Sequence, residues 1–353
     1  MVGAHDRVAL DIRALELDRE RPAAELEELR VVLEHVVDAG AGDGPDRPGV
    51  GVVRDRLGGA ADYIAHLSAA LGDRRLEGQS VVVDCGNGAA FEVAPWALRV
   101  RGAWVRVLHD EPDGTNINAG CGSTDPAELQ QAVVAARADA GLAFDGDADR
   151  VIAVDERGNL VDGDQMLAII ALDLHERGEL RGDAVVATVM SNLGLRHALT
   201  EHGIGVIETP VGDRNVLTAL EEYGLSLGGE QSGHVILADL ATTGDGTLTG
   251  MLLLDVMARR GRPLSELAAV VEPLPQVLRS VQVGDGAGLE HDGAFRAELE
   301  AVEQQLGADG RVLVRPSGTE PVVRVMVEAP TSEQAETAAT RLAAAVERAC
   351  GSG

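Results

Sequence analysis

The stretch 140-AGLAFDGDADRVIAVD-155 decides the fold that we predict. It contains an apolar run, three aspartates at alternate positions (Asp145, Asp147 and Asp149) and a second apolar run. Short apolar runs bounded by polar residues are typical of buried strands, so we expect the aspartates in a loop between two strands. Clustered carboxylates repel one another unless a cation or a proton lies between them. The loop therefore raises a question of chemistry as well as of fold.

Strands and helices alternate on both sides of the acidic loop. Upstream, we predict helices at 59–71, 91–102 and 127–138 and strands at 79–85, 103–109 and 139–144. Directly downstream, residues 151–163 predict a hairpin that turns at Asp155–Asn159. The alternation then restarts with helices at 164–178 and 216–224 and strands at 183–190 and 205–211. Polar Gly/Asn turns follow the first strand of each half, at 84-DCGNG-88 and 191-SNLG-194.

This order predicts an α/β fold with two successive three-layer α/β/α domains and mixed sheets. A small C-terminal α+β domain follows, and a remnant of a further α/β domain, with a helix at 18–37 and a linker, precedes them. We place the boundaries at 1–45, 46–160, 161–273 and 274–353. Sites in such sheets form outside the carboxyl ends of the strands, where the polar turns lie.

Composition limits the partners of the chain. Its 353 residues carry a formal net charge of −28, which disfavours nucleic acid and anionic membranes as partners. Three widely spaced cysteines (Cys85, Cys121 and Cys350) suit a reducing compartment and form no metal-ligand pair. We find no run of apolar residues long enough to span a membrane and no secretory signal. The cytoplasm is the expected location.

The acidic loop suits a hard divalent cation. Mg²⁺ binds through a few carboxylates and keeps water or phosphate oxygens as its other ligands. One alternative is a calcium-binding EF-hand, because Glu156 falls at the twelfth position counted from Asp145. The sixth position, which needs glycine in that loop, is Arg150, and the flanks are predicted strands, so we disfavour it. The other alternative is a solvated acidic turn.

Two further loops carry polar groups suited to a phosphorylated sugar. The loop 228-GGEQSGH-234 offers Glu230, Ser232 and His234 to a polyol, although a Gly-rich hairpin turn would explain it equally well. The loop 315-RPSGTEPVVRV-325 offers hydroxyls and backbone N–H groups between two arginines, which match phosphate oxygens. A capped turn with surface arginines is the alternative there. Together the three loops favour a phosphosugar enzyme.

In this order, "FDGDADR", "GGEQSGH" and "RPSGTEP" resemble the metal, sugar and phosphate loops of the α-D-phosphohexomutase family. Further matches are "VVDCGNGAA", "DGTNINAGCGST", "TVMSNLGL", "VGDRNV" and "LATTGDG", and the resemblance covers roughly residues 50–350. The pairing of "NINAGCGST" with Gln231 favours the glucosamine branch of the family. Specificity for glucose or mannose phosphates is the alternative.

The resemblance implies a cytoplasmic isomerase that converts glucosamine 6-phosphate to glucosamine 1-phosphate through a phosphoserine and a bisphosphate intermediate, for amino-sugar nucleotide and cell-wall precursor synthesis. It implies Mg²⁺ as cofactor and a small-molecule phosphosugar as partner, together with a homodimer or a complete paralogue. The implied metal ligands are the three aspartates, and Arg150 is an electrostatic partner of the transferring phosphoryl group. The implied sugar residues are Glu230, Ser232, His234 and Arg214, and the implied phosphate residues are Arg315, Ser317, Gly318, Thr319 and Arg324.

The beginning of the sequence departs from the family pattern. The family carries a Ser-His-Asn-Pro nucleophile loop in its first domain, and the sequence contains no such motif. The stretch 3-GAHDR-7 aligns best with that loop and puts Ala4 at the nucleophile position; an unrelated start is the alternative. Because alanine has no hydroxyl to phosphorylate, we expect impaired turnover. A non-catalytic homologue that binds Mg²⁺ and phosphosugar, or a truncated gene product, would also explain this pattern.

Overall fold

The structure is a computed structural model that describes residues 59–283, 289–317 and 321–350. The predicted remnant domain at 1–45, with its helix at 18–37 and Ala4, lies outside the described residues. The chain divides into two compact units, Met1–Ala65 and His66–Gly353. Apart from the first residues of helix α3 (Gly59–Leu71), everything described below belongs to the second unit.

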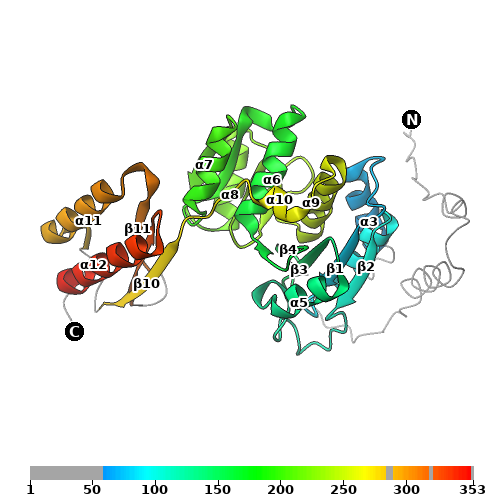
Figure 1. The fold of residues 1–353 in the computed structure, drawn as a ribbon, viewed down its shortest axis with the longest axis horizontal. Coiled ribbons are helices and arrows are strands. Elements are labelled where there is room, and N and C mark those ends of the chain that lie inside the picture. The colour runs from blue at the N-terminus through cyan, green and yellow to red at the C-terminus, as the bar shows by residue number, and fades with distance from the viewer. Residues whose placement is uncertain (1–58, 284–288, 318–320, 351–353) are drawn as a thin grey trace, which may run out of the picture. The chain divides into compact units, whose positions relative to one another are not determined.

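The first sheet has five strands in the order β2-β1-β3-β4-β5 (Figure 1). The parallel strands are β1 (Ser80–Asp84), β2 (Trp104–Leu108) and β3 (Ala140–Phe144), and the antiparallel ones are β4 (Val151–Asp155) and β5 (Leu160–Val161). Helices α4 (Ala90–Val100) and α5 (Ala127–Ala136) connect them. Gly141 of β3 faces α5, whereas its neighbour Leu142 faces helix α9 (Gly246–Arg260). The sheet is therefore covered on both faces.

The second sheet has four strands in the order β7-β6-β8-β9. Strands β6 (Ala184–Thr188), β7 (Gly205–Thr209) and β8 (Leu227–Gly229) are parallel, and β9 (Val235–Leu237) is antiparallel to β8. Its helices are α6 (Gly163–Glu176), α7 (Leu193–Glu201), α8 (Asp213–Tyr223) and α10 (Leu264–Ala268). Asp162 and Gln165 form a reciprocal capping box that starts α6. This second mixed α/β/α domain confirms the predicted repeat of architecture.

Helices α9, α10 and α11 (Gly293–Leu306) have no counterpart among the sequence-based predictions. Most of α9 is buried, from Gly246 to Met257, because it packs against both β4 and α6. A helix that is buried on nearly every side shows little amphipathic period, which is the signal that predicts a surface helix. Asp245, which accepts a hydrogen bond from the Leu248 N–H, marks its start.

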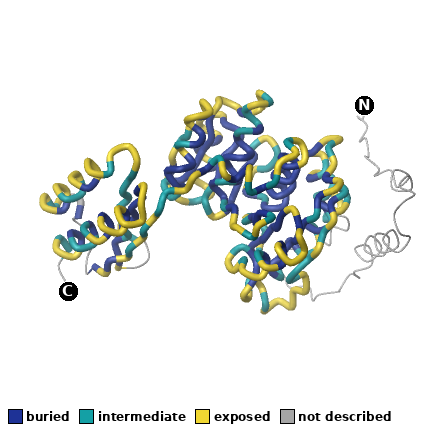
Figure 2. The backbone as a smooth tube through the Cα atoms, in the orientation of Figure 1, coloured by how far each residue is buried: buried dark blue, intermediate teal, exposed yellow. Residues whose placement is uncertain are grey.

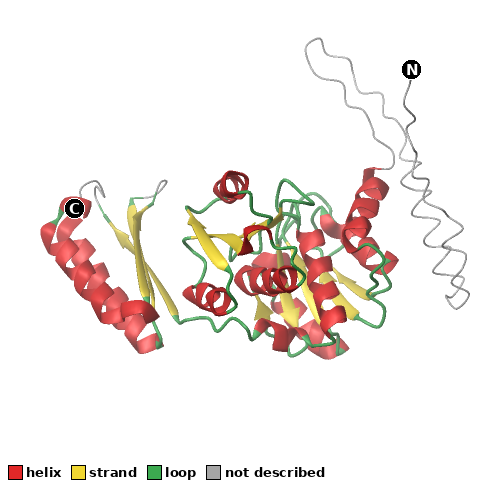
Figure 3. Ribbon diagram, turned by 90° about the horizontal axis from the view of Figure 1, so that it is seen from above, coloured by secondary structure: helices red, strands yellow, loops and turns green. Residues whose placement is uncertain are grey.

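The C-terminal domain is a three-stranded antiparallel sheet with helices on one face (Figure 3). Its elements are β10 (Gln276–Gln282), β11 (Arg311–Pro316), β12 (Val322–Glu328), α11 and α12 (Ser332–Cys350). The core contains Val323, Val325 and Val327 of β12. Short 3₁₀ turns in the chain are Gly122–Thr124, Arg181–Asp183, Leu289–His291 and Gly307–Asp309. This α+β arrangement agrees with the predicted fold class.

Charged groups join the C-terminal sheet to the second sheet. Glu328 is fully buried and accepts hydrogen bonds from Arg311 Nε at 2.6 Å and from the Leu193 N–H at 3.0 Å. Arg311 also donates to the Ser191 carbonyl. In the same turn, Asn192 bonds both the N–H and the carbonyl of Leu274. The 191-SNLG-194 turn is therefore fixed to the start of the C-terminal domain.

Burial follows the layers of the fold. The central strands β1, β3 and β6 are buried almost throughout, whereas the edge strands β2 and β7 are mostly intermediate or exposed. In Figure 2 the buried colour accordingly lies inside the layers and the exposed colour on the outside, and α9 is buried along most of its length. Within the described ranges, we find no helix with the length and apolar character needed to cross a membrane.

Candidate active site

The metal loop, which we define as residues 145–150, joins β3 to β4 at the carboxyl end of β3. The backbone of two neighbouring loops holds it. The Ala89 N–H donates to the Gly146 carbonyl at 2.9 Å, and the Gly246 N–H donates to the Ala148 carbonyl at 2.9 Å. A Cβ on Gly88 would lie 2.5 Å from the Gly146 oxygen, so this approach requires glycine. The "DCGNG" turn thus supports the acidic loop.

The metal loop brings the three predicted ligands together. One carboxylate oxygen from each of Asp145, Asp147 and Asp149 lies within 4.8 Å of the others. Asp145 is buried, Asp147 is exposed and Asp149 is intermediate. Burial, followed by the neighbouring carboxylate of Asp149, raises the pKa of Asp145 to about 6. A carboxyl group that keeps its proton beside a second carboxylate marks a place where positive charge is favourable.

The oxygens of this loop fit a magnesium ion. They are hard carboxylate donors, and Asp149 Oδ1 is buried without a hydrogen-bond partner among the described residues. Arg150 Nε lies 3.6 Å from Asp149 Oδ1 and 3.9 Å from Asp145 Oδ2. Arg150 therefore neutralises part of the charge of the same carboxylates. The EF-hand alternative is excluded by the flanks, because β3 and β4 are strands.

Asp84, which is not among the residues predicted for the site, organises the loops next to the metal loop. It is fully buried at the end of β1 and accepts N–H groups of Gly86 and Gly122, each at 2.9 Å. His109 Nδ1, at the end of β2, lies 3.0 Å from Asp84 Oδ1. The sequence marks Asp84 only by its position, at the end of an apolar strand and directly before a Gly-rich turn.

The sugar loop, which we define as residues 230–234, turns between β8 and β9. Its turn is closed by the Glu230 N–H, which donates to the His234 carbonyl at 2.9 Å. Glu230 Oε1 accepts the Gly212 N–H at 3.0 Å, which brings the loop beside the first turn of α8. Arg214 in that turn and Ser232 are both exposed. The four residues predicted to bind the sugar thus come from the sugar loop and from the adjoining first turn of α8.

His234, the fourth of these residues, is placed differently from the expectation that it contacts the sugar. Its side chain is 1% exposed. Nδ1 lies 3.1 Å from Asp149 Oδ2, and Nε2 accepts the Gly244 N–H at 3.2 Å. Because both ring nitrogens are engaged, neither is left for a sugar hydroxyl in this conformation. The residue belongs to the surroundings of the metal loop.

The phosphate loop follows β11. Arg315 of β11 lies directly opposite Arg324 of β12 in the antiparallel ladder. Like charges in that position are destabilising, so an anion between them would be favourable. The Ser317 N–H donates to the Val322 carbonyl at 2.8 Å and continues the hairpin. Gly318 and Thr319 lie outside the described residues.

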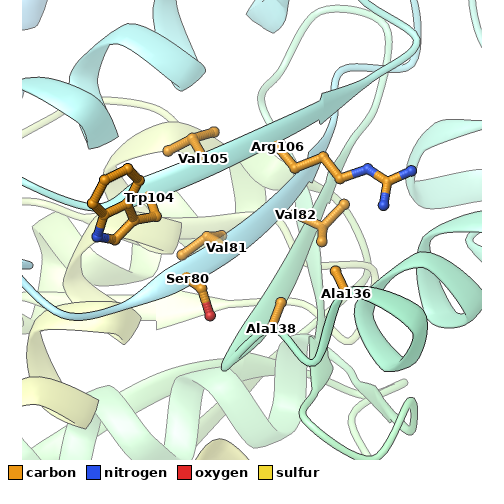
Figure 4. Close-up of a pocket in the computed structure, with 8 residues that line it drawn as sticks. All are labelled: Ser80, Val81, Val82, Trp104, Val105, Arg106, Ala136 and Ala138. Carbon is orange, nitrogen blue, oxygen red and sulfur yellow. The ribbon is translucent and has the colours of Figure 1, made fainter. Parts of the chain in front are cut away.

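The hollow drawn in Figure 4 lies elsewhere on the first sheet. It is lined by Ser80, Val81, Val82, Trp104, Val105, Arg106, Ala136 and Ala138. Ser80 and Trp104 begin β1 and β2, so the hollow lies toward the amino ends of the parallel strands. The metal loop lies at their carboxyl ends, where ligands bind in such sheets. The hollow is therefore separate from the candidate site.

Three family models match consecutive parts of the chain. They are the phosphoglucomutase/phosphomannomutase α/β/α domain II at 61–158, α/β/α domain III at 162–274 and C-terminal domain at 271–345. The metal loop falls in the first match, the sugar loop in the second and the phosphate loop in the third.

The sequence is also similar to curated relatives from the same family. The phosphoglucosamine mutase of Salinispora tropica is 54% identical over 326 residues, which are 92% of this chain and 72% of the relative. That of Acidothermus cellulolyticus is 55% identical over 90% of this chain and 70% of its own length.

Two solved structures have the same fold. A phosphoglucomutase/phosphomannomutase family protein of Burkholderia thailandensis (TM-score 0.68, 26% identity) matches 82% of this chain and 64% of its own. Aspergillus fumigatus N-acetylphosphoglucosamine mutase in complex with GlcNAc-6P and magnesium (TM-score 0.68, 21% identity) matches 83% of this chain and 65% of its own. The chain thus spans a little under two thirds of these proteins. From the family models and the relatives together, it follows that the chain belongs to the phosphoglucomutase/phosphomannomutase family of α-D-phosphohexomutases.

Proposed function

We propose that the chain carries the metal, sugar and phosphate sites of a phosphoglucosamine mutase, which interconverts glucosamine 6-phosphate and glucosamine 1-phosphate. The observation that carries the proposal is the direct contact between the acidic metal loop and the sugar loop, through Asp149 and His234. Such a contact puts a divalent cation beside a sugar-binding loop, as phosphoryl transfer to a sugar requires. The identity of 54% to phosphoglucosamine mutases supports this substrate over glucose or mannose phosphates.

Each group in the site has a proposed role. Asp145, Asp147 and Asp149 hold Mg²⁺, which when bound stabilises the charge that develops on the phosphoryl oxygens. Arg150 provides a second positive charge toward the transferring group. Glu230 and Ser232 accept and donate hydrogen bonds to the sugar hydroxyls, and exposed Arg214 attracts the anionic substrate.

The C-terminal domain holds the phosphate that does not react. Arg315 and Arg324 lie opposite each other and share that anion. Ser317 adds its hydroxyl, and Gly318 and Thr319 complete the loop in this proposal. During the reaction the bisphosphate intermediate carries one phosphate at each end. A fixed binding site for the phosphate that does not react therefore positions the other end of the sugar at the metal loop.

A second candidate function is binding of Mg²⁺ and phosphosugar without turnover. It is favoured by Ser68, the first serine among the described residues, which lies within α3 with its hydroxyl oxygen buried and without a hydrogen-bond partner among those residues. A buried hydroxyl inside a helix is unsuited to carry a phosphoryl group between substrate molecules.

A coupled mutase assay separates the two functions. Glucosamine 6-phosphate is supplied with Mg²⁺ and glucose 1,6-bisphosphate as activator, and glucose and mannose 6-phosphates serve as competing substrates. Turnover that is fastest with glucosamine 6-phosphate and is lost in Asp147→Ala supports the mutase. Calorimetric binding of Mg²⁺ and glucosamine 6-phosphate without turnover supports the second function. Absence of both turnover and binding refutes both.

A further inference from the structure

His234 lies between the metal loop and the turn that precedes α9. Its imidazole is almost completely buried, and it has one hydrogen-bond partner on each ring nitrogen. The Nε2 partner is the backbone N–H of Gly244, at 3.2 Å. The Nδ1 partner is Oδ2 of the metal-loop residue Asp149, at 3.1 Å.

These two partners determine which nitrogen carries the proton. A backbone N–H can only donate, so Nε2 must accept from Gly244 and has no hydrogen. The hydrogen is therefore on Nδ1 and is donated to Asp149 Oδ2. This leaves Asp149 with one oxygen held by the imidazole and the other, Oδ1, buried and without a hydrogen-bond partner among the described residues. Apart from the Arg150 guanidinium, whose Nε lies 3.6 Å away, no donor faces Asp149 Oδ1 among the described residues, so this oxygen is the one left for a cation.

Two glycines let backbone approach His234 and its loop closely. A Cβ on Gly244 would lie 2.4 Å from His234 Cε1 and 2.5 Å from Nδ1. In the loop that carries the ring, the Val151 N–H donates to the Gly233 carbonyl at 3.2 Å, and a Cβ on Gly233 would lie 2.0 Å from the Val151 carbonyl oxygen. The Gly244 backbone therefore lies against the ring, and Gly233 holds the sugar loop against the first residue of β4.

We propose that His234 is a positioning residue for the cation: it holds Asp149 by one oxygen and presents the other to the metal. This inference rests on the proposed metal site and assigns His234 to that site instead of to the sugar. Groups that hydrogen-bond a metal ligand orient it and increase its basicity, and their loss typically weakens metal binding about 10- to 100-fold.

Binding of Mn²⁺, used as a paramagnetic substitute for Mg²⁺, tests the inference without reference to activity. Electron paramagnetic resonance counts the free ion during titration. His234→Phe removes the Nδ1 donor, and we expect its dissociation constant to rise about 10- to 100-fold. His234→Asn places an amide nitrogen near the former Nδ1, and we expect an affinity within a few-fold of the parent. Gly244→Ala displaces the ring without removing it and also presses on the Asp149 carbonyl oxygen, 2.7 Å from the added Cβ, so it should weaken binding at least as much as His234→Phe.

A matched control uses another histidine that lies beside an aspartate. His175 Nδ1 lies 2.9 Å from Asp183 Oδ1, at the end of α6 and outside the metal loop. His175→Phe should leave the affinity for Mn²⁺ unchanged. Circular dichroism of each variant shows whether it is folded. If His234→Phe does not fold, Gly244→Ala and His234→Asn still provide the comparison.

Two failures are distinguishable. A parent protein that binds no Mn²⁺ overturns the proposed metal site and this inference together. A parent that binds Mn²⁺ through Asp147, with an unchanged affinity in folded His234→Phe or Gly244→Ala, overturns the inference alone. Equal weakening in His234→Asn and His234→Phe also overturns it, because the donated hydrogen would then have no part in binding.

Discussion

Replacing Asp164 by asparagine should stabilise the protein at neutral and alkaline pH. Asp164 lies in the first turn of α6 and is 1% exposed. Its Oδ2 accepts the Asn192 N–H at 2.7 Å, whereas Oδ1 has no hydrogen-bond partner among the described residues. Burial, followed by the negative charge of Asp162, raises its pKa to about 7. Asparagine keeps an acceptor for Asn192 and carries no charge to bury.

The sign and size of the effect follow from this pKa. The folded protein holds the proton of Asp164 up to about pH 7, whereas the unfolded chain releases it near the ordinary aspartate pKa of 3.8. Above pH 7, folding therefore costs the free energy of burying the charged carboxylate of Asp164. This cost decreases as the pH falls below the pKa of the folded protein, and it is gone below the pKa of the unfolded chain. Three pK units correspond to roughly 4 kcal/mol, of which about 2–3 kcal/mol is relieved between about pH 8 and pH 5.

Urea unfolding of the parent and Asp164→Asn over this pH range measures the effect. Hydrogen exchange of the α6 amides, within Gly163–Glu176, identifies the transition in which this helix unfolds. Asp155→Asn is the matched control, because Asp155 is 3% exposed but accepts three N–H groups from Arg157 and Asn159. That control should lose stability. A difference between Asp164→Asn and parent that is constant with pH, or that shrinks as pH rises, refutes the reasoning.

Three further outcomes are expected. Because a proton competes with the cation at Asp145, whose pKa is about 6, the affinity for Mg²⁺ should fall about tenfold per pH unit below that value, measured by calorimetry. Glu328→Ala should destabilise the protein by about 3–5 kcal/mol in thermal or urea unfolding, because it leaves Arg311 partly buried without its carboxylate; Glu336→Ala, at an exposed position of α12, should change the stability little. Gly88→Ala should weaken Mg²⁺ binding, since its methyl group would displace the metal loop; an unchanged calorimetric affinity would contradict this.

Much of the fold could be predicted because its strands are short apolar runs that end in polar turns. The runs at Val81–Val83 and Ala140–Phe144 became β1 and β3, and the turn at Asp155–Asn159 closes the β4–β5 hairpin. Helix α9 was not predicted, because burial on all sides removes the periodic pattern that identifies a helix at the surface.

The candidate site was predicted in part. The three aspartates are local in sequence, so their meeting follows from one loop. The partnership of His234 with Asp149 joins residues 85 positions apart and depends on how two domains pack, which no local pattern shows. Gly244 has no side chain that could indicate a role in the site. It acts through its N–H, which donates to His234, and through the absence of a Cβ, which leaves room for the imidazole. The assignments of Glu230, Ser232 and Arg315 remain predictions.

Strand β11 also sets the distance between two arginines, Arg311 and Arg315. It begins at Arg311, which is bound to Glu328 and to the Ser191 carbonyl, and it leads to Arg315 at the phosphate loop. Side chains alternate along a strand at about 3.3 Å per residue, so four steps keep both arginines on one face, roughly 13 Å apart. A single inserted residue would turn Arg315 toward the helices, and two would restore the face but add about 7 Å. Insertions in this strand should therefore be tolerated, if at all, only in even numbers.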